Sequence, residues 1–596
     1  MKKIETPVDF LRTYLQYIGY RFYIIFSFVG VAALLEGVGI TLLLPLLKTL
    51  QVESEADGGF AFRLLDSMLE GIGIADSSIG ILIFIAALFV VKAGFQFSSK
   101  AYEGYLNSCL LFELKEKLFH HFSKMNYQYY THRNTGHFIN VVNAQVDAFT
   151  RSFGFFVRFL TNIIMAICYV AIALVVSWRF GVMTLAIVGI LLFPLQRLNQ
   201  YVRELSRHAS HEAGTLNKLL VQVLHAYKYI VSTAQAAHVH SRVTDSVRRL
   251  TSYKLRKEIA EAITGTIREP ITVVTIVGIV SVQVLVLGEP LAPILIAILL
   301  FNRSLQSIMG VQSNWQHTVS LSGSVEMVDE EFRQVRQHHE KDGSVSIEHF
   351  SDEIRLEDIS FQYQDADENA VHGITLSIPV NSMVAFVGRS GAGKSTLVDL
   401  LTLLLRPSQG AMYIDDIPAQ DVDLFSWRSK IGYVSQETVI FDDTIANNIG
   451  LWNEGNASNT SQKIREAAMQ ASAHEFIQNL PKGYQTSVGD RGIRLSGGQK
   501  QRLFIARELY KEPDLLLLDE ATSSLDTESE RYIQQSIDRL KGKVTVVIIA
   551  HRLSTIKDVD HIYVLEDGEI AEHGPYEELR SRHESWFREM AKQQSL

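Results

Sequence analysis

Apolar residues are distributed unevenly along this chain, and before about residue 316 they form runs long enough to cross a lipid bilayer. A membrane-spanning helix needs about 20 mostly apolar residues. Five runs meet this requirement, and a sixth qualifies if its polar continuation faces water inside the protein. The pattern therefore predicts a helical membrane domain over residues 1–316, with spans at about 22–47, 79–97, 153–177, 180–196, 271–287 and 291–315.

Basic residues gather in two long connections, 98–152 and 197–270, whereas the charged residues of the 48–78 connection are mostly acidic. Lys and Arg beside spans mark the cytoplasmic side, so we expect both termini in the cytoplasm and the spans in the cytoplasmic (inner) membrane. Both basic connections are expected to extend the spans as helices. They would turn in coupling segments near 127–140 and 224–234, although plain amphipathic hairpins without a docking role are an alternative.

From about residue 351 the pattern changes to short β-branched runs that alternate with turns and helices. This alternation is typical of an α/β domain, so we expect a second domain over 351–596 and a linker over 317–350. The formal net charge of −9 argues against a general nucleic-acid binder, which is usually basic.

A glycine-rich stretch, GRSGAGKST, stands between a predicted strand and a predicted helix. Its spacing fits the phosphate-binding loop (P-loop) of nucleotide-binding proteins. Backbone amides at the helix N-terminus would meet the phosphates of ATP, Lys394 would neutralise the terminal phosphates, and Ser395 can ligate Mg²⁺. The expected ATP-binding residues here are Gly388, Arg389, Ser390, Gly391, Ala392, Gly393, Lys394, Ser395 and Thr396.

Two further buried strands are predicted to end in polar residues that can act on ATP. Four leucines precede Asp519, which is placed to hold Mg²⁺, and Glu520, which can polarise the attacking water. The strand VTVVIIA precedes His551, a candidate for contacting the γ-phosphate and that water, or else a purely structural histidine. The carboxyl ends of parallel strands meet at one edge of a sheet, where such active sites lie.

These motifs, taken in order, make segment 351–596 resemble the nucleotide-binding domain of ABC transporters. The resemblance implies that Tyr363 stacks on adenine and that Gln436 joins the metal and the attacking water to the membrane domain. It identifies LSGGQ at 495–499 as the family signature and Asp526 as part of the D-loop. The expected fold is thus a six-helix, all-α transmembrane domain followed by an α/β P-loop ATPase domain, similar to multidrug and lipid-flippase exporters.

In the family, two nucleotide-binding domains pair head to tail, so that each signature closes on the ATP held by the other domain. A chain with one such domain and six spans resembles half of a transporter. A homodimer is the expected assembly, with a heterodimer as the alternative. The signature residues expected to contact ATP across the dimer are Ser496, Gly497, Gly498 and Gln499.

Four ionisable residues lie within or beside the predicted spans: Glu36, Lys92, Arg158 and Arg303. Such residues are functional candidates because charge is costly inside a membrane. Three cations against one acid would leave an inward cavity positive, which suits an amphipathic anion. Alternatively, Glu36 and Lys92 pair with each other, and Arg158 extends its charge to the membrane surface.

The expected function is ATP-driven export or flipping of an amphipathic substrate, with a membrane lipid as the natural partner. An anionic lipid-linked glycan or glycolipid is the favoured substrate, because LLEGVGITLLLPLL in the first span is similar to flippases of lipid-linked oligosaccharides. Flipping of lipid A or phospholipid, and export of drugs or peptides, are alternatives. An ATP-gated channel is the alternative from another functional class.

Overall fold

The computed structural model describes the chain apart from residues 1–3, 5, 50–66, 134, 177–199, 203, 206, 210, 267, 282–290, 364–365, 454–456, 521–526, 551, 583–584 and 595–596. The chain divides into two compact units. Unit 1 comprises Met1–Met125 and Tyr129–His339, and unit 2 comprises Asn126–Gln128 and Glu340–Leu596.

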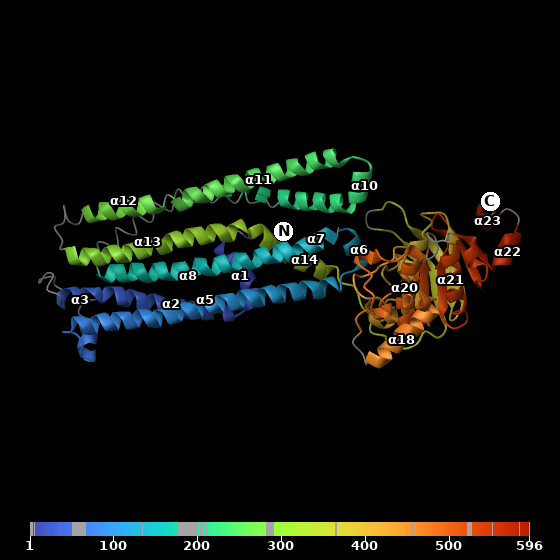
Figure 1. Ribbon diagram of the computed structural model, residues 1–596, viewed down its shortest axis with the longest axis horizontal. Helices are drawn as coiled ribbons and strands as arrows, with labels where there is room; N and C mark the ends of the chain where they lie inside the picture. The colour runs from blue at the N-terminus through green and yellow to red at the C-terminus, as the bar shows by residue number, and fades with distance from the viewer. Residues whose placement is uncertain are drawn as a thin grey trace. The chain divides into compact units, whose positions relative to one another are not determined.

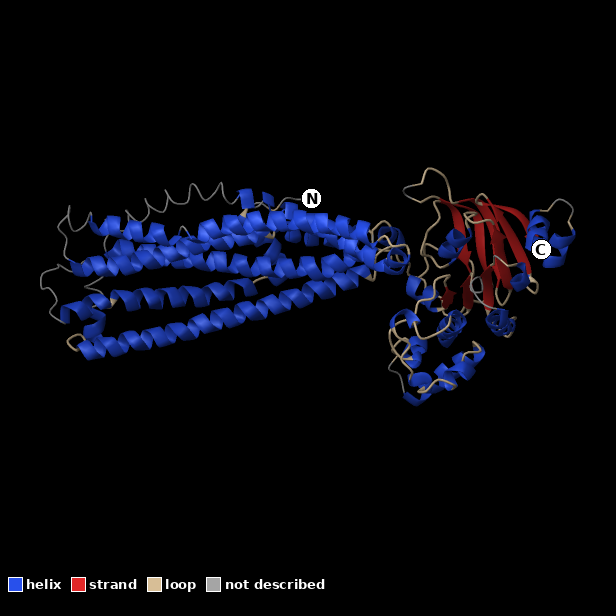
Figure 2. Ribbon diagram, turned by 45° about the horizontal axis from the view of Figure 1, so that its top comes forward, coloured by secondary structure: helices blue, strands red, loops and turns tan. Residues whose placement is uncertain are grey.

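Unit 1 is built from long helices that lie side by side (Figures 1 and 2). Its helices are α1 (Pro7–Ile18), α2 (Arg21–Thr41), α3 (Leu43–Thr49), α5 (Ser78–Phe122), α6 (Tyr127–Thr131), α7 (Thr135–Asn140), α8 (Val146–Val176), α10 (Tyr227–Ser232), α11 (Ala236–Thr266), α12 (Arg268–Ser281), α13 (Leu291–Ser320) and α14 (Ser322–Gln337). The first two residues of α6 belong to unit 2.

Three helices in the described part of the chain are long and apolar enough to cross a membrane: α2, α5 and the run Thr135–Val175, which includes nearly all of α8. Along α5 the apolar side chains of Ile83 and Val90 are 65% and 72% exposed, as expected for a surface that faces lipid. The predicted span 180–196 lies outside the described residues. Helix α13 runs unbroken through the polar stretch of the predicted sixth span.

Helices α5 and α14 lie partly or wholly in segments predicted to stand outside the membrane. Helix α5 is 45 residues long and continues well beyond the predicted span 79–97, as expected for a span that is extended by a helix outside the membrane. Segment 317–350, expected as a linker, contains α14, a helix that buries Val325, Val328 and Val335. An apolar residue at every third or fourth position gives α14 a buried face.

Unit 2 contains two sheets in the part of the chain that is described. One is antiparallel, with the order β2-β1-β4-β5, and the other has the order β10-β9-β3-β8-β7-β6, in which β10 alone runs antiparallel to its neighbour. The strands are β1 (Glu353–Phe361), β2 (Val371–Pro379), β3 (Met383–Gly388), β4 (Gln409–Ile414), β5 (Ile417–Pro418), β6 (Ile431–Val434), β7 (Leu515–Asp519), β8 (Thr545–Ile549), β9 (His561–Glu566) and β10 (Glu569–Gly574).

Nine described α-helices of unit 2 accompany its strands, all of which are drawn red in Figure 2. They are α15 (Lys394–Leu401), α16 (Leu424–Ser429), α17 (Ile445–Gly450), α18 (Ala457–Gln470), α19 (His474–Gln478), α20 (Gly497–Tyr510), α21 (Thr527–Asp538), α22 (Tyr576–Ser581) and α23 (Trp586–Gln594). Strands β7 and β8 are buried at every position, as expected for a parallel sheet covered on both faces.

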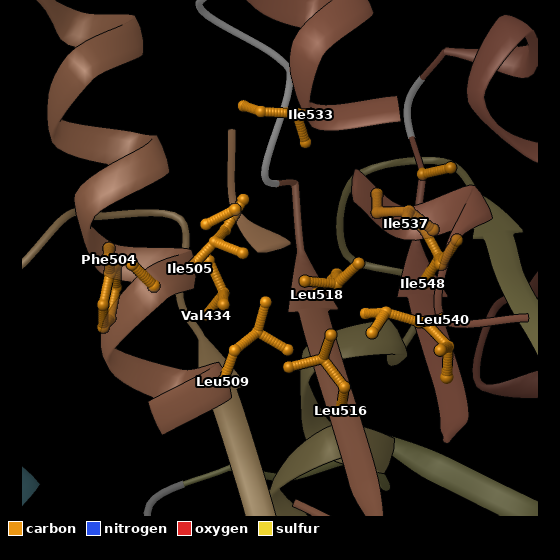
Figure 3. Packing of buried hydrophobic residues seen from close by; sticks show 14 of the residues in the cluster. Val434, Phe504, Ile505, Leu509, Leu516, Leu518, Ile533, Ile537, Leu540 and Ile548 are labelled. Carbon is orange, nitrogen blue, oxygen red and sulfur yellow. The ribbon is translucent and has the colours of Figure 1, made fainter. Parts of the chain in front are cut away.

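One face of this sheet is packed by α20 (Figure 3). Ile505 and Leu509 of α20 join Leu516 and Leu518 of β7 in one apolar cluster, and each is at most 4% exposed. Leucines on β7 alternate between the two faces of the sheet, so Leu515 and Leu517 pack in a second cluster beneath α15 and α16. The core therefore fixes β7, and with it the acidic residues at its end.

Candidate nucleotide site and buried charge cluster

Parallel pairing in the larger sheet brings the ends of four strands to one edge. In β8, Ile549 lies opposite both Phe386 of β3 and Asp519 of β7, and β6 runs parallel to β7. The segments that follow these strands therefore emerge on the same side of the sheet. They include the P-loop after β3, Gln436 after β6, and Glu520 after β7, so the fold gathers the residues expected to act on ATP.

The P-loop needs glycine at two positions where the main chain passes close to its neighbours. A Cβ on Gly388 would lie 2.2 Å from the carbonyl oxygen of Leu565, and one on Gly393 would lie 2.7 Å from that of Ala370. Gly393 also has φ +93°, which disfavours other residues. The loop can thus form the tight cradle, opening onto the start of α15, that phosphates require.

Lys394 is held inside the P-loop. Its ammonium group donates to the carbonyl oxygens of Gly388 at 2.9 Å and Arg389 at 2.8 Å. Burial lowers the pKa of Lys394, while the nearby charges of Glu520 and Asp519 act in the opposite direction. The predicted role of Lys394 requires this ammonium to leave the loop carbonyls for the phosphates of ATP.

Asp519 and Glu520 differ in exposure at the end of β7. Asp519 is 9% exposed, whereas Glu520 is partly exposed and has φ +51°, an unusual conformation for a residue with a side chain. Such backbone strain is found at functional sites. The Gln436 amide donates to the Glu520 carboxylate at 2.9 Å, which joins two of the three predicted catalytic residues.

Oxygen donors at this edge fit Mg²⁺, which prefers carboxylate, hydroxyl and amide oxygens. Ser395 is exposed at the first turn of α15, Asp519 presents a carboxylate, and Gln436 presents a side-chain amide. When bound, Mg²⁺ would neutralise charge on the transferred phosphoryl group.

The other predicted ATP-binding residues of the P-loop differ in exposure, and one of them contacts Tyr363. Ser390 and Gly391 are exposed, whereas Ala392 and Thr396 are buried. The Tyr363 hydroxyl lies 3.3 Å from the Thr396 hydroxyl, so Tyr363 stands beside α15.

The signature forms the start of α20. Ser496 is the N-cap, and its hydroxyl accepts from the Gln499 amide at 3.3 Å, while the Ser496 amide donates to the Gln499 side chain at 3.0 Å. Ser496 and Gly497 are exposed, and Gly498 is buried. This capped helix N-terminus can accept an anion from outside the unit. Asp526 and His551, the other two predicted site residues, lie outside the described residues.

Arg507 of α20 was not anticipated from the sequence, and it links the signature helix to the segment that follows Gln436. It is 3% exposed, and its guanidinium donates to the carbonyl oxygens of Val439 and Asn448, each at 2.6 Å. Its guanidinium carbon also lies 5.1 Å from the centroid of the Phe441 ring and 5.4 Å from that of Phe504, within cation–π range. Burial lowers the pKa of Arg507. The apolar residues around it in FIARELY gave the only hint of its burial.

We expect Arg507→Lys to destabilise the protein by about 1.5–3 kcal/mol, because lysine cannot reproduce the guanidinium fork and leaves a buried carbonyl unpaired. The check is thermal unfolding of the purified full chain. Arg465→Lys, on the exposed face of α18, serves as the matched control and should melt like the unsubstituted protein. Equal melting temperatures for both variants would contradict the inferred role of Arg507.

The predicted membrane-depth charges also meet in the structure. Glu36 of α2 is 2% exposed and lies 2.8 Å from the ammonium of Lys92 in α5 and 3.2 Å from the Nε of Arg303 in α13. The Tyr169 hydroxyl of α8 donates to Glu36 at 2.5 Å. This charge cluster (Glu36, Lys92, Tyr169 and Arg303) therefore joins four helices and carries a net charge of +1.

The two cations of the charge cluster differ in exposure, and Arg158 does not contribute to the cluster. The side chain of Lys92 is 11% exposed and that of Arg303 is 49% exposed. Arg158 instead pairs with Glu103 at 3.1 Å. The pairing of Glu36 with Lys92, raised as an alternative from the sequence, is present. Tyr169 was missed, although a tyrosine in the apolar run IIMAICYVAIALVV was a signal.

Both domains of the chain are similar to those of known proteins. Residues 371–523 match the family model described as ABC transporter, and residues 22–309 match the model described as ABC transporter transmembrane region. The solved structure of a bacterial Atm1-family ABC exporter with ATP bound superimposes with a TM-score of 0.78 and 26% identity, covering 95% of this chain and 98% of that chain.

Curated relatives are similar over nearly their whole length. The heterocyst differentiation ATP-binding protein HepA of Nostoc sp. is 30% identical over 93% of this chain and 91% of its own. An ATP-dependent lipid A-core flippase of Chromohalobacter salexigens is 31% identical over 87% of this chain and 90% of its own. These matches confirm the predicted fold class and the ATPase domain. The chain belongs to the ABC transporter family, as a membrane-embedded exporter that couples ATP hydrolysis to transport.

Proposed function

We propose that this exporter flips or exports an anionic lipid-linked glycan or glycolipid across the cytoplasmic membrane. The observation that carries the proposal is the half-exposed guanidinium of Arg303 in the charge cluster. Its Nε binds Glu36, and no other ion pair of Arg303 occurs among the described residues. A guanidinium exposed to hydrocarbon is costly, so this face of α13 belongs to a water-filled pathway, where Arg303 can bind an anionic headgroup.

Other residues of α13 support a polar pathway. Gln306 and Ser313 are exposed, and they share a face with Arg303 because they follow it by three and ten residues along the helix. With the net charge of +1, this face favours an anion, while the lipid tails remain in the bilayer. The similarity to a relative named as a lipid A-core flippase supports a lipid as the transported class.

The proposal includes a homodimer with two ATP sites. In each site, Ser395, Asp519 and Gln436 hold Mg²⁺, Glu520 polarises the attacking water, and Ser496 of the partner subunit's signature closes on the γ-phosphate. Support comes from the exposed position of Ser496 and Gly497. Large side chains on α10, in the predicted coupling segment 224–234, are also exposed: Tyr227 by 64% and Tyr229 by 66%. Exposed apolar surface of this kind marks a contact with another protein surface, and the partner subunit would supply it. The proposal also includes the predicted position of both termini in the cytoplasm.

The test is ATP-dependent flipping of a fluorescent polyprenyl-pyrophosphate-linked glycan in proteoliposomes. Arg303→Ala should lower the transport rate at limiting substrate by about 10- to 100-fold, because a charge-assisted hydrogen bond to the headgroup is lost. Arg249→Ala is the matched control: its side chain is 56% exposed and pairs with Glu212, but it lies in the cytoplasmic connection 197–270. Transport by this control should remain unchanged.

Two outcomes contradict this proposal. Unchanged flipping by Arg303→Ala would show that Arg303 does not bind the headgroup, and an anionic substrate would no longer be supported. ATP-dependent ion currents without vectorial transport would favour a gated channel instead.

A further inference from the structure

We propose that Trp586, in the C-terminal helix α23, is a positioning residue for the P-loop. It holds the side chain of Arg389 and so keeps the loop in the shape that receives ATP. This role goes beyond the proposed function, because it concerns ATP affinity and not the transported substrate.

The start of helix α23 is held to the rest of unit 2 by hydrogen bonds and by apolar packing. The Trp586 amide donates to the Glu572 carboxylate of β10 at 2.8 Å, and the Ser585 hydroxyl donates to the same carboxylate at 2.7 Å. Phe587 is completely buried in the core beside Leu579. Because Phe587 points into the core, its neighbour Trp586 is directed to another side of the helix, where it remains 38% exposed.

At that position the indole meets the P-loop. The guanidinium carbon of Arg389 lies 5.1 Å from the centroid of the Trp586 ring, within the range of a cation–π interaction. Arg389 is exposed, and within the described residues it has no ion pair with an acid. Among the described residues, the recorded contact of this guanidinium is with the Trp586 ring.

A cavity leaves this flank of the loop without close packing. It has a volume of about 200 Å³ and is lined by Gly388 and Arg389 of the loop, by Glu566 of β9, and by Trp586 and Met590 of α23. Apolar packing does not fill this space, so the contact between Trp586 and Arg389 carries the restraint that α23 exerts on the loop.

The restrained segment is the one that holds Lys394, the predicted phosphate-binding lysine. The carbonyl oxygens of Gly388 and Arg389 accept from the ammonium of Lys394. Fixing Arg389 thus fixes the two carbonyls that orient Lys394 before ATP arrives. A loop ordered in advance loses less entropy on binding, so its affinity for ATP is higher.

The experiment measures ATP hydrolysis by the purified full-length protein as a function of ATP concentration. Trp586→Ala should raise KM for ATP about two- to fivefold with kcat unchanged, as expected for loss of an exposed cation–π contact. Trp586→Phe keeps an aromatic face and should restore KM, whereas Trp586→Leu keeps only apolar bulk and should behave like the alanine variant. A general structural defect would lower kcat and would not separate phenylalanine from leucine.

A double-mutant cycle with Arg389→Gln assigns the effect to this pair. In the Arg389→Gln background, Trp586→Ala should cause no further rise in KM, since the partner of the ring is already absent. Full additivity of the two substitutions would overturn the proposal, and so would an unchanged KM in Trp586→Ala. Active hydrolysis with an unchanged KM would leave the exporter function standing, so the two failures are distinguishable.

Discussion

Glu520→Gln should lower the rate of ATP hydrolysis by about 10²- to 10⁴-fold while ATP binding is retained. Glutamine has nearly the same shape as glutamate but cannot take a proton from the attacking water. It can still meet the Gln436 amide, which lies 2.9 Å from the Glu520 carboxylate. Phosphate release by the full-length protein measures hydrolysis, and retention of radiolabelled ATP on a filter measures binding.

Glu437→Gln is the matched control, because Glu437 is an exposed carboxylate next to Gln436 and has no proposed part in the chemistry. Its rate of hydrolysis should equal that of the unsubstituted protein. Near-normal turnover by Glu520→Gln would remove Glu520 from the role of general base. Loss of ATP binding in the same variant would show instead that Glu520 supports the nucleotide site.

Glu36→Ala should destabilise the membrane domain by about 3–5 kcal/mol, the usual cost of removing one partner from a buried ion pair. Lys92 is only 11% exposed, so its ammonium would remain buried without its acid, and Tyr169 would lose the acceptor of its hydroxyl. Arg303→Ala should cost less, because its side chain is 49% exposed and water can replace part of the contact. Thermal unfolding in detergent micelles measures both.

The double variant Glu36→Ala with Lys92→Met tests the cause of this loss. Replacing both charges with apolar groups removes the unpaired ammonium and should recover most of the lost stability. A Glu36→Ala protein as stable as the unsubstituted one would show that the charge cluster does not hold α2, α5, α8 and α13 together.

The nucleotide site could be predicted from the sequence because its parts are local. Gly388 to Thr396 form one strand–loop–helix segment, and the spacing within it already sets which amides and side chains meet the phosphates. Asp519 and Glu520 end a run of four leucines whose burial identifies a strand. The edge of a parallel sheet then brings these segments together by a general rule of the fold.

The partners of the membrane charges could not be chosen from the sequence in the same way. Glu36 and Arg303 are 267 residues apart, and a helix pattern gives depth in the membrane but not which helices are neighbours. The charge cluster depends on the packing of four helices. Tyr169, the fourth member, stands in an apolar run where a tyrosine is equally well explained by simple burial.

Local pattern and spacing thus determined the helical membrane domain, the P-loop and the acidic end of β7, because each depends on residues adjacent in the chain. The tertiary structure alone decided that Glu36 binds both Lys92 and Arg303, and that Trp586 covers Arg389. Contacts between distant segments depend on packing geometry, which sequence periodicity does not specify.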